Sequence, residues 1–178
     1  MRRVEVLPYN PVWQERFREE SGHIRHVLSK NITEIHHIDS TSIPNIWAKP
    51  IIDIMVEVVE IHEVDQQQSS MEALNYEALG EYGIAGRRYF RKHNQEGIRT
   101  HHVHMFQVGS GQIERHLAFR DYMIAHPKDA QAYSDLKQEL ARAHPTDIEA
   151  YMDGKHEFIT TMDKRAAQWR KDHSTTIL

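Results

Sequence analysis

The chain of 178 residues contains no cysteine. Without thiols it can form no disulfide, offer no thiolate to zinc and use no cysteine nucleophile. This composition fits a reducing compartment. No apolar run approaches the length of a membrane span, and the opening Met-Arg-Arg-Val-Glu-Val lacks the apolar core of a secretory signal peptide. We therefore expect a cytoplasmic protein with no membrane partner.

The net charge is also small, since 22 basic and 26 acidic residues give a value of −4. A protein whose main task is to grip nucleic acid usually carries a clear basic excess, so we do not expect a nucleic acid partner. Neither a Walker loop nor a Gly-x-Gly-x-x-Gly turn occurs, and no serine or cysteine triad is visible. These absences exclude the commonest nucleotide-binding loops and the triad hydrolases. The sequence gives no indication of oligomeric state.

The hydrophobic pattern predicts an α+β protein, a small mixed β-sheet flanked by helices and followed by a C-terminal helical region. The length indicates one domain, 1–178, with an α/β core at 1–112 and a helical region at 113–178 packed on it. Asn10 and Pro11 are typical of a helix start, with Asn10 as the N-cap. The expected helices are 11–29, 62–79 and three from 113 onward, broken at His126-Pro127 and His144-Pro145; the expected strands are 32–38, 51–59, 87–92 and 99–108, the last two joined by the turn 94–97.

The most informative stretch is 36–58, where a hydroxyl-rich turn stands between two apolar strands. Lys49 and Pro50 lead into the second strand, which carries Asp53 and Glu57. Because side chains alternate along a strand, Asp53, Met55 and Glu57 share one face. A carboxylate on a buried strand is costly unless it is paired, hydrogen-bonded or bound to a cation. Asp53 and Glu57 are therefore the candidate catalytic residues.

The run Ser40-Thr-Ser-Ile-Pro followed by Ala48-Lys-Pro-Ile-Ile-Asp-Ile resembles the signature of the GrpB family. Further segments fit the same family: Arg99-Thr-His-His-Val-His, Phe119-Arg-Asp-Tyr-Met, Tyr133-Ser-Asp-Leu-Lys and Tyr151-Met-Asp-Gly-Lys-His-Glu-Phe-Ile. The resemblance covers nearly the whole chain and implies a fold similar to polymerase-beta-type nucleotidyltransferases. Some relatives resemble a domain fused to a coenzyme A biosynthetic kinase, which favours a phosphate-containing ligand.

The nucleotidyltransferase superfamily pattern is a Gly-Ser turn followed by Asp-x-Asp or Asp-x-Glu on a strand, and this chain departs from it twice. Asp39 stands in place of the glycine, where it brings a Cβ and a negative charge toward any bound phosphate. Met55 stands in place of the second carboxylate, so Glu57 is the candidate substitute. Both departures weaken the case for ordinary nucleotidyl transfer.

Histidine is abundant, with 14 residues, and three of them fall together on the strand predicted at 99–108. His102 and His104 share one face of that strand. If it neighbours the strand of Asp53, the imidazoles and carboxylates converge on a divalent metal, with Asp53, Glu57, His102 and His104 as ligands. Oxygen ligands suit Mg, whereas imidazole shifts the preference toward Mn or Zn. The alternative is that these histidines are hydrogen-bonded core residues or solvated edge residues.

Candidate phosphate contacts form a second group. The hydroxyls and backbone amides of the turn could bind a phosphate, although such clusters are also ordinary turn chemistry. By analogy with the superfamily, Lys137, Tyr151 and Lys155 are expected to contact a triphosphate. Arg120 could instead form a structural ion pair with Asp121. The full set of predicted nucleotide-binding residues is Ser40, Thr41, Ser42, Lys49, Arg88, Arg120, Lys137 and Lys155, with Arg91 and Arg115 as further cleft candidates.

These observations support three hypotheses about function. The first is metal-dependent transfer of a nucleotidyl group to an acceptor, with Asp53 and a metal aligning the nucleotide. The second is a catalytically degenerate module that binds a nucleotide, a coenzyme or a metal. The third, hydrolysis of a phosphate ester, requires Asp53, Glu57, His102 and His104 in one coordination sphere. The expected partner is a nucleotide or another phosphate-containing small molecule.

Overall fold

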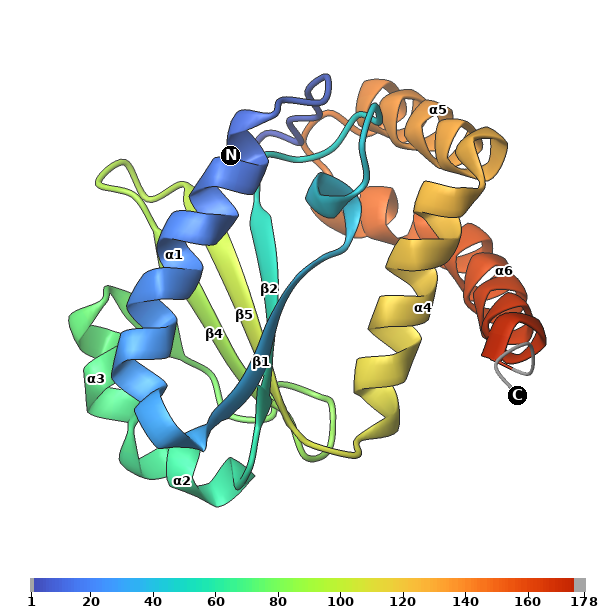
Figure 1. Cartoon of the computed structure of the whole chain (residues 1–178). Helices are drawn as coiled ribbons and strands as arrows, with labels where there is room; N and C mark the ends of the chain where they lie inside the picture. Colours follow the sequence, from blue (N-terminus) through green and yellow to red (C-terminus); the bar gives the residue numbers. More distant parts are fainter. Residues whose placement is uncertain (1, 175–178) are drawn as a thin grey trace. The chain divides into compact units, whose positions relative to one another are not determined.

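The computed structural model describes residues 2–174 and confirms the α+β class. Figure 1 shows the order of its elements along the chain. The helices are α1 (Val12–Leu28), α2 (Ile61–Gln66), α3 (Gln68–Ala73), α4 (Gly111–Ala125), α5 (Pro127–Ala143) and α6 (Ile148–Ser174). The strands are β1 (Ile32–Ile38), β2 (Ile52–Val58), β3 (Tyr76–Ala78), β4 (Arg88–His93) and β5 (Arg99–Gln107), and short 3₁₀ turns occupy Ser29–Asn31 and Ser40–Ser42.

The chain folds into two compact units, and both are assembled from segments that are separate in the sequence. The sheet unit consists of Pro11–Ile38 and Ile51–Ile113. The helical unit gathers Met1–Asn10, Asp39–Pro50 and Glu114–Leu178. The hydroxyl-rich turn therefore belongs with the C-terminal helices, although it connects two strands of the sheet. The expected single domain with a boundary at 112 stays a prediction.

The sheet unit contains a mixed sheet in the order β1-β2-β5-β4-β3. β2 and β5 run parallel, and the other neighbours are antiparallel. Helix α1 packs against β1 and β2, as Figure 1 shows, with the ring of Phe17 stacked on that of His37 at 4.8 Å between centroids. His37 pairs with Ile54, so the face of the sheet that α1 covers carries the apolar side chains of β2. Asp53 lies on the opposite face.

The helical unit has its own apolar core. Ile43 and Ile46, from the segment between β1 and β2, belong to the same cluster of buried side chains as Phe119 of α4 and Tyr133 of α5. The Trp47 backbone N–H donates a hydrogen bond to Ser134 Oγ at 2.8 Å. The segment between the strands is therefore part of this core and not a loop lying over it.

Two local predictions are wrong. The helix expected at 62–79 is two short helices and strand β3, because Gln67 has non-helical angles (φ −94°, ψ 3°) and Asn75 has a left-handed φ of 70°. This stretch is polar and rich in glutamine and serine, and its helix propensity is too weak to keep one continuous helix where tertiary contacts favour a break. Asn10 is also not the N-cap, since Pro11 holds that position without a side-chain hydrogen bond.

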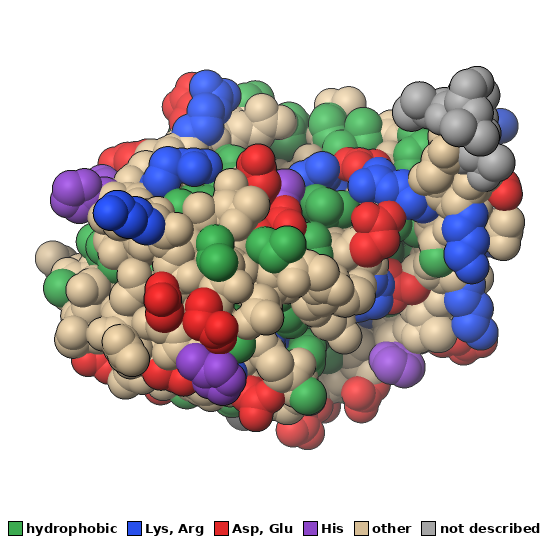
Figure 2. All heavy atoms as spheres, turned by 60° about the horizontal axis from the view of Figure 1, so that its bottom comes forward, with side chains coloured by type: hydrophobic (Ala, Val, Ile, Leu, Met, Phe, Trp, Pro, Cys, Tyr) green, Lys and Arg blue, Asp and Glu red, His purple; other side chains and the backbone are tan. Residues whose placement is uncertain are grey.

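Within residues 2–174, none of the helices combines the length and the low polarity that crossing a bilayer requires. On the face drawn in Figure 2, acidic and basic side chains are interspersed with hydrophobic and other polar ones. This mixture agrees with the small net charge of −4.

Candidate functional site

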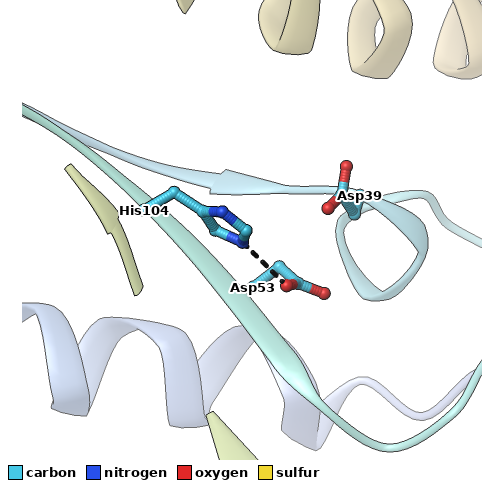
Figure 3. A group of neighbouring side chains, drawn as sticks. All are labelled: Asp39, Asp53 and His104. Atoms are coloured by element: carbon cyan, nitrogen blue, oxygen red, sulfur yellow. Dashed lines mark hydrogen bonds and ion pairs between the residues drawn. The ribbon is translucent and has the colours of Figure 1, made fainter. Parts of the chain in front are cut away.

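The carboxylate of Asp53 lies between two imidazoles within the sheet unit. Its Oδ1 is 3.2 Å from His104 Nε2 and 3.4 Å from His102 Nδ1. Figure 3 shows the ring of His104 pointing at this carboxylate. The parallel register explains the convergence, because Asp53 is paired with His102 and Met55 with His104 on adjacent strands. The structure thus brings together three of the residues that the sequence analysis selected.

Burial alone would raise the pKa of Asp53, because it penalises the charged carboxylate. Hydrogen bonds from His102 and His104 and their electrostatic interaction with the carboxylate outweigh that effect, so the net result is a lowered pKa for Asp53. The carboxylate is therefore ionised at neutral pH. It provides a fixed negative charge on a sheet face where Met55 beside it is fully buried.

Arg87, which the sequence analysis did not select, fixes the orientation of His104. It is buried, and its Nη1 lies 3.3 Å from His104 Nδ1. Its Nε and Nη2 donate to the backbone oxygens of Glu81 and Tyr82. A guanidinium has donors only, so His104 Nδ1 must accept. The neutral ring then carries its proton on Nε2 and donates it to Asp53.

Aromatic rings enclose the same group. Tyr89 lies with its ring centroid 5.7 Å from that of His102 and 5.2 Å from that of His104. The Arg87 guanidinium packs over Tyr89 at 4.7 Å. His102 Nε2 is buried and has no hydrogen-bond partner within the described residues. Burial patterns of this kind leave no mark on the sequence, which explains why Arg87 and Tyr89 were missed.

The donor set of this cluster suits a transition-metal ion, since it combines a carboxylate oxygen with imidazole nitrogens. The Asp53 carboxylate fits that role, whereas His102 faces it with Nδ1, so the unpartnered Nε2 of His102 lies on the far side of the ring. His104 does not fit it in its present hydrogen bonding, because one ring nitrogen accepts from Arg87 and the other carries the proton donated to Asp53.

Several other predicted residues are engaged elsewhere. Glu57 Oε2 contacts His36 Nε2 at 2.5 Å. Four residues of extended strand separate Glu57 from Asp53, a rise of about 13 Å, which is too far for two ligands of one ion. The structure therefore does not bring together the four-ligand sphere that the hydrolysis hypothesis requires.

The arginines that were predicted to contact a phosphate form ion pairs: Arg88 with Asp65, Arg91 with Glu77, Arg115 with Asp163, and Arg120 with Asp121.

A second cluster, here called the lysine cluster, lies in the helical unit and consists of Lys49, Lys137 and Lys155. Lys137 is 1% exposed and Lys155 is 7% exposed. Lys137 Nζ lies over the ring of Tyr133 at 4.2 Å, and the Nζ atoms of Lys49 and Lys155 lie over the ring of Tyr151 at 5.1 and 4.7 Å. Within the described residues, Lys137 Nζ has no hydrogen-bond partner, and neither has the buried Tyr151 hydroxyl.

Burial is the main influence on Lys137, and the positive charges of Lys155 and Lys49 add to it. Together they lower the pKa of Lys137 to about 6, against a smaller opposing effect of Asp39. Burial also raises the pKa of Tyr151, which keeps its hydroxyl protonated at neutral pH. The cluster therefore contains one uncharged amine beside two charged ones, with a phenol donor close to the charged pair.

The hydroxyl turn belongs to the same unit. Ser40 Oγ donates to Tyr133 Oη at 3.4 Å, and Ser42 Oγ donates to the backbone oxygen of Asp39 at 2.5 Å. Asp39 has φ 58° and ψ −158°, a region that is essentially reserved for glycine. The turn thus has a glycine-type conformation, although an aspartate occupies the position. The Asp39 carboxylate pairs with His116 at 3.6 Å.

Comparisons with known proteins agree over most of the chain. The family model described as GrpB protein matches residues 3–165. The UPF0157 protein YqkA of Bacillus subtilis is 50% identical over 170 residues, which are 96% of this chain and 49% of the relative. A UPF0157 protein of Pseudomonas aeruginosa is 38% identical over 146 residues, 79% of this chain and 58% of its own length. This chain therefore spans about half the length of the Bacillus relative.

A solved structure also matches. The crystal structure of the conserved protein GrpB from Enterococcus faecalis has a TM-score of 0.89 and 46% sequence identity. The match covers 93% of this chain and 99% of the other.

Proposed function

This chain belongs to the GrpB family, and we propose that it binds a phosphate-bearing small molecule, a nucleotide first of all, through the lysine cluster. The observation that carries this proposal is the buried Lys137 amine, which has no hydrogen-bond partner within the described residues. A buried polar group without a partner is costly, and native proteins keep few of them. A phosphate oxygen would supply the missing acceptor.

Three features favour a phosphate over a carboxylate. The amines come from three segments, the chain before β2, helix α5 and helix α6, so they can surround a ligand with several oxygens. Charge from Lys49 and Lys155 suits a ligand that carries more than one negative charge. The Tyr151 hydroxyl, which has no hydrogen-bond partner within the described residues, can donate to a further oxygen.

Metal-dependent nucleotidyl transfer is the second candidate, and the ionised carboxylate of Asp53 favours it. A divalent ion, when bound, would supply Lewis-acid chemistry to a phosphoryl group. Asp53 would hold it, and Arg87 would keep His104 oriented toward the carboxylate. The catalytic role of Asp53 and Glu57 and the metal role of His102 and His104 stay predictions.

The first test is thermal unfolding of metal-stripped protein with ATP, GTP, CTP, coenzyme A and inorganic phosphate, each with and without Mg, Mn or Zn. A ligand at a hundred times its dissociation constant adds about 2.7 kcal/mol to the free energy of unfolding. We expect such a shift with a phosphate-bearing ligand in the wild type and a smaller one in Lys137→Met. Lys128→Met is the matched control, because Lys128 is an exposed lysine on the same helix.

Each outcome has a separate meaning. No shift with any phosphate compound, or an undiminished shift in Lys137→Met, contradicts phosphate binding at the lysine cluster. A shift that requires both a metal and a nucleotide, together with product formation that is lost in Asp53→Asn, favours nucleotidyl transfer. A metal-independent shift without product favours the degenerate binding module.

A further inference from the structure

The three amines of the lysine cluster differ in their surroundings, and this difference indicates a role in addition to anion binding. Lys49 lies at the chain before β2, while Lys137 of α5 is buried and has no hydrogen-bond partner in the described part of the chain. A site that only attracts an anion gains nothing from desolvating one of its cations, because an uncharged amine adds no charge. A lysine in an apolar site next to other cationic groups is, however, the arrangement that turns an amine into a nucleophile.

We propose that Lys137 is a nucleophilic lysine that captures an aldehyde or ketone carrying a phosphate, by forming an imine at its carbonyl carbon. This inference rests on the proposed phosphate site, since Lys49 and Lys155 would hold the phosphate while Lys137 meets the carbonyl.

The surroundings of Lys137 suit this division of roles. Its amine lies over the ring of Tyr133, which stacks on Phe158 at 5.4 Å between centroids, so its immediate contact is an aromatic face and not water. The charged groups that act on it are Lys155 from α6, Lys49 before β2 and Asp39 at the hydroxyl turn. With the pKa of Lys137 lowered to about 6, the neutral amine exceeds the charged form by about ten to one at pH 7.

The chemistry balances without an oxidant or a reductant. The lone pair of Lys137 Nζ forms a C–N bond to the carbonyl carbon while the C=O π bond breaks, and one proton passes from the nitrogen to the oxygen to give the carbinolamine. The C–O bond then breaks, the oxygen takes up the second proton lost by the nitrogen and leaves as water, and the nitrogen lone pair completes the C=N bond. Tyr151 remains protonated because burial raises its pKa, so it can donate a hydrogen bond to the ligand held by Lys155 and Lys49.

Pyridoxal 5′-phosphate is the probe for the test, because it joins an aldehyde to a phosphate. The full chain is incubated with it at pH 7 and reduced with sodium borohydride, and the modified lysines are located by peptide mass spectrometry. We expect modification at Lys137 to exceed that at the exposed Lys128 by at least about tenfold, since an ordinary lysine is almost wholly protonated at this pH. Pyridoxal without the phosphate should react more slowly, and inorganic phosphate should compete.

Two substitutions at Lys137 separate the imine from phosphate binding. Lys137→Met should lose the adduct and diminish the phosphate-induced thermal shift, because inorganic phosphate then loses the hydrogen bond from Nζ. Lys137→Arg keeps N–H donors but cannot form an imine, so it should lose the adduct and retain a phosphate shift. Far-ultraviolet circular dichroism and the unfolding midpoint establish that both variants fold.

The outcomes distinguish the two proposals. A phosphate-induced shift without a preferred adduct at Lys137 overturns the imine and leaves the proposed function intact. A preferred adduct that forms equally fast with pyridoxal, and is not slowed by phosphate, overturns phosphate binding and leaves the nucleophilic amine. Labelling of lysines in proportion to their exposure, together with no phosphate shift, overturns both.

Discussion

At the scale of single residues, Asp39 has a backbone conformation that residues with a side chain rarely adopt. A non-glycine residue at φ 58° and ψ −158° carries strain of about 1–3 kcal/mol. The hydrogen bond from Ser42 Oγ to the Asp39 backbone oxygen and the pairing of its carboxylate with His116 help to hold it there. Strain that persists in this way is commonly found where a side chain is needed for function.

Replacing Asp39 with glycine should therefore stabilise the protein. We expect Asp39→Gly to raise the free energy of unfolding by about 1 kcal/mol, because relief of strain exceeds the added entropy of the unfolded chain and the lost pairing with His116. Urea denaturation measures the change. Asn45→Gly is the control, since Asn45 at φ 66° is a residue type that tolerates this region. A lower stability for Asp39→Gly would show that the carboxylate contacts outweigh the strain.

Asp53 should make stability depend on pH. Its pKa is lower in the folded protein than in the unfolded chain, so the stabilisation is present above the unfolded pKa, near 4, and disappears as pH falls through the folded pKa. Asp53→Asn should lower the free energy of unfolding by about 1.5–3 kcal/mol at pH 7, because the hydrogen bonds to a charged carboxylate are lost. Urea midpoints from pH 7 to pH 2 test this, and the gap between wild type and variant should narrow below about pH 4. A gap that stays constant over this range would mean that the carboxylate charge contributes nothing.

At the scale of elements, the helices and strands that the sequence predicts correctly are those whose hydrophobic residues recur with a clear period. The alternation in 32–38 and 51–59 matches β1 and β2, and the turn Asn94–Gly97 joins β4 to β5 as expected. The segment 62–79 failed because its break depends on tertiary contacts, such as the hydrogen bond from the Gln67 side chain to the Leu28 backbone oxygen at 3.1 Å. No local pattern encodes a partner 39 residues away.

Helix packing gives an element-scale prediction with an internal control. In α1, a Cβ added at Gly22 meets nothing within 4 Å, so Gly22→Ala should stabilise the protein by about 0.5–1 kcal/mol through helix propensity. In α6, a Cβ at Gly154 would lie 2.4 Å from Leu140 Cδ2 of α5. Gly154→Ala should therefore gain less or destabilise, because Leu140 must move. Urea midpoints of both variants provide the comparison, and equal gains would mean that Leu140 moves without cost.

At the scale of the whole molecule, the sequence located the site residues by type but could not assign their partners. Period-two alternation put Asp53 on one face of its strand and His102 and His104 on one face of theirs, and only the parallel register of β2 and β5 brought them together. The arginines were candidates because of their charge, and four of them proved to be in ion pairs. Burial of Lys137 depends on how α5 packs, which a count of charged residues cannot reveal.

The division of the chain has a consequence for its synthesis on the ribosome. The helical unit takes its first pieces from residues up to Pro50 and the rest from Glu114 onward, so its early segment emerges long before its partners. The apolar side chains of Ile43 and Ile46 therefore stay exposed while the rest of the sheet unit is translated. In a chain arrested near residue 113, chaperones or proteases could reach that segment. Once α6 has been made and has packed, the segment is buried. Burial of Ile43 and Ile46 therefore depends on helices that are translated after the whole sheet unit.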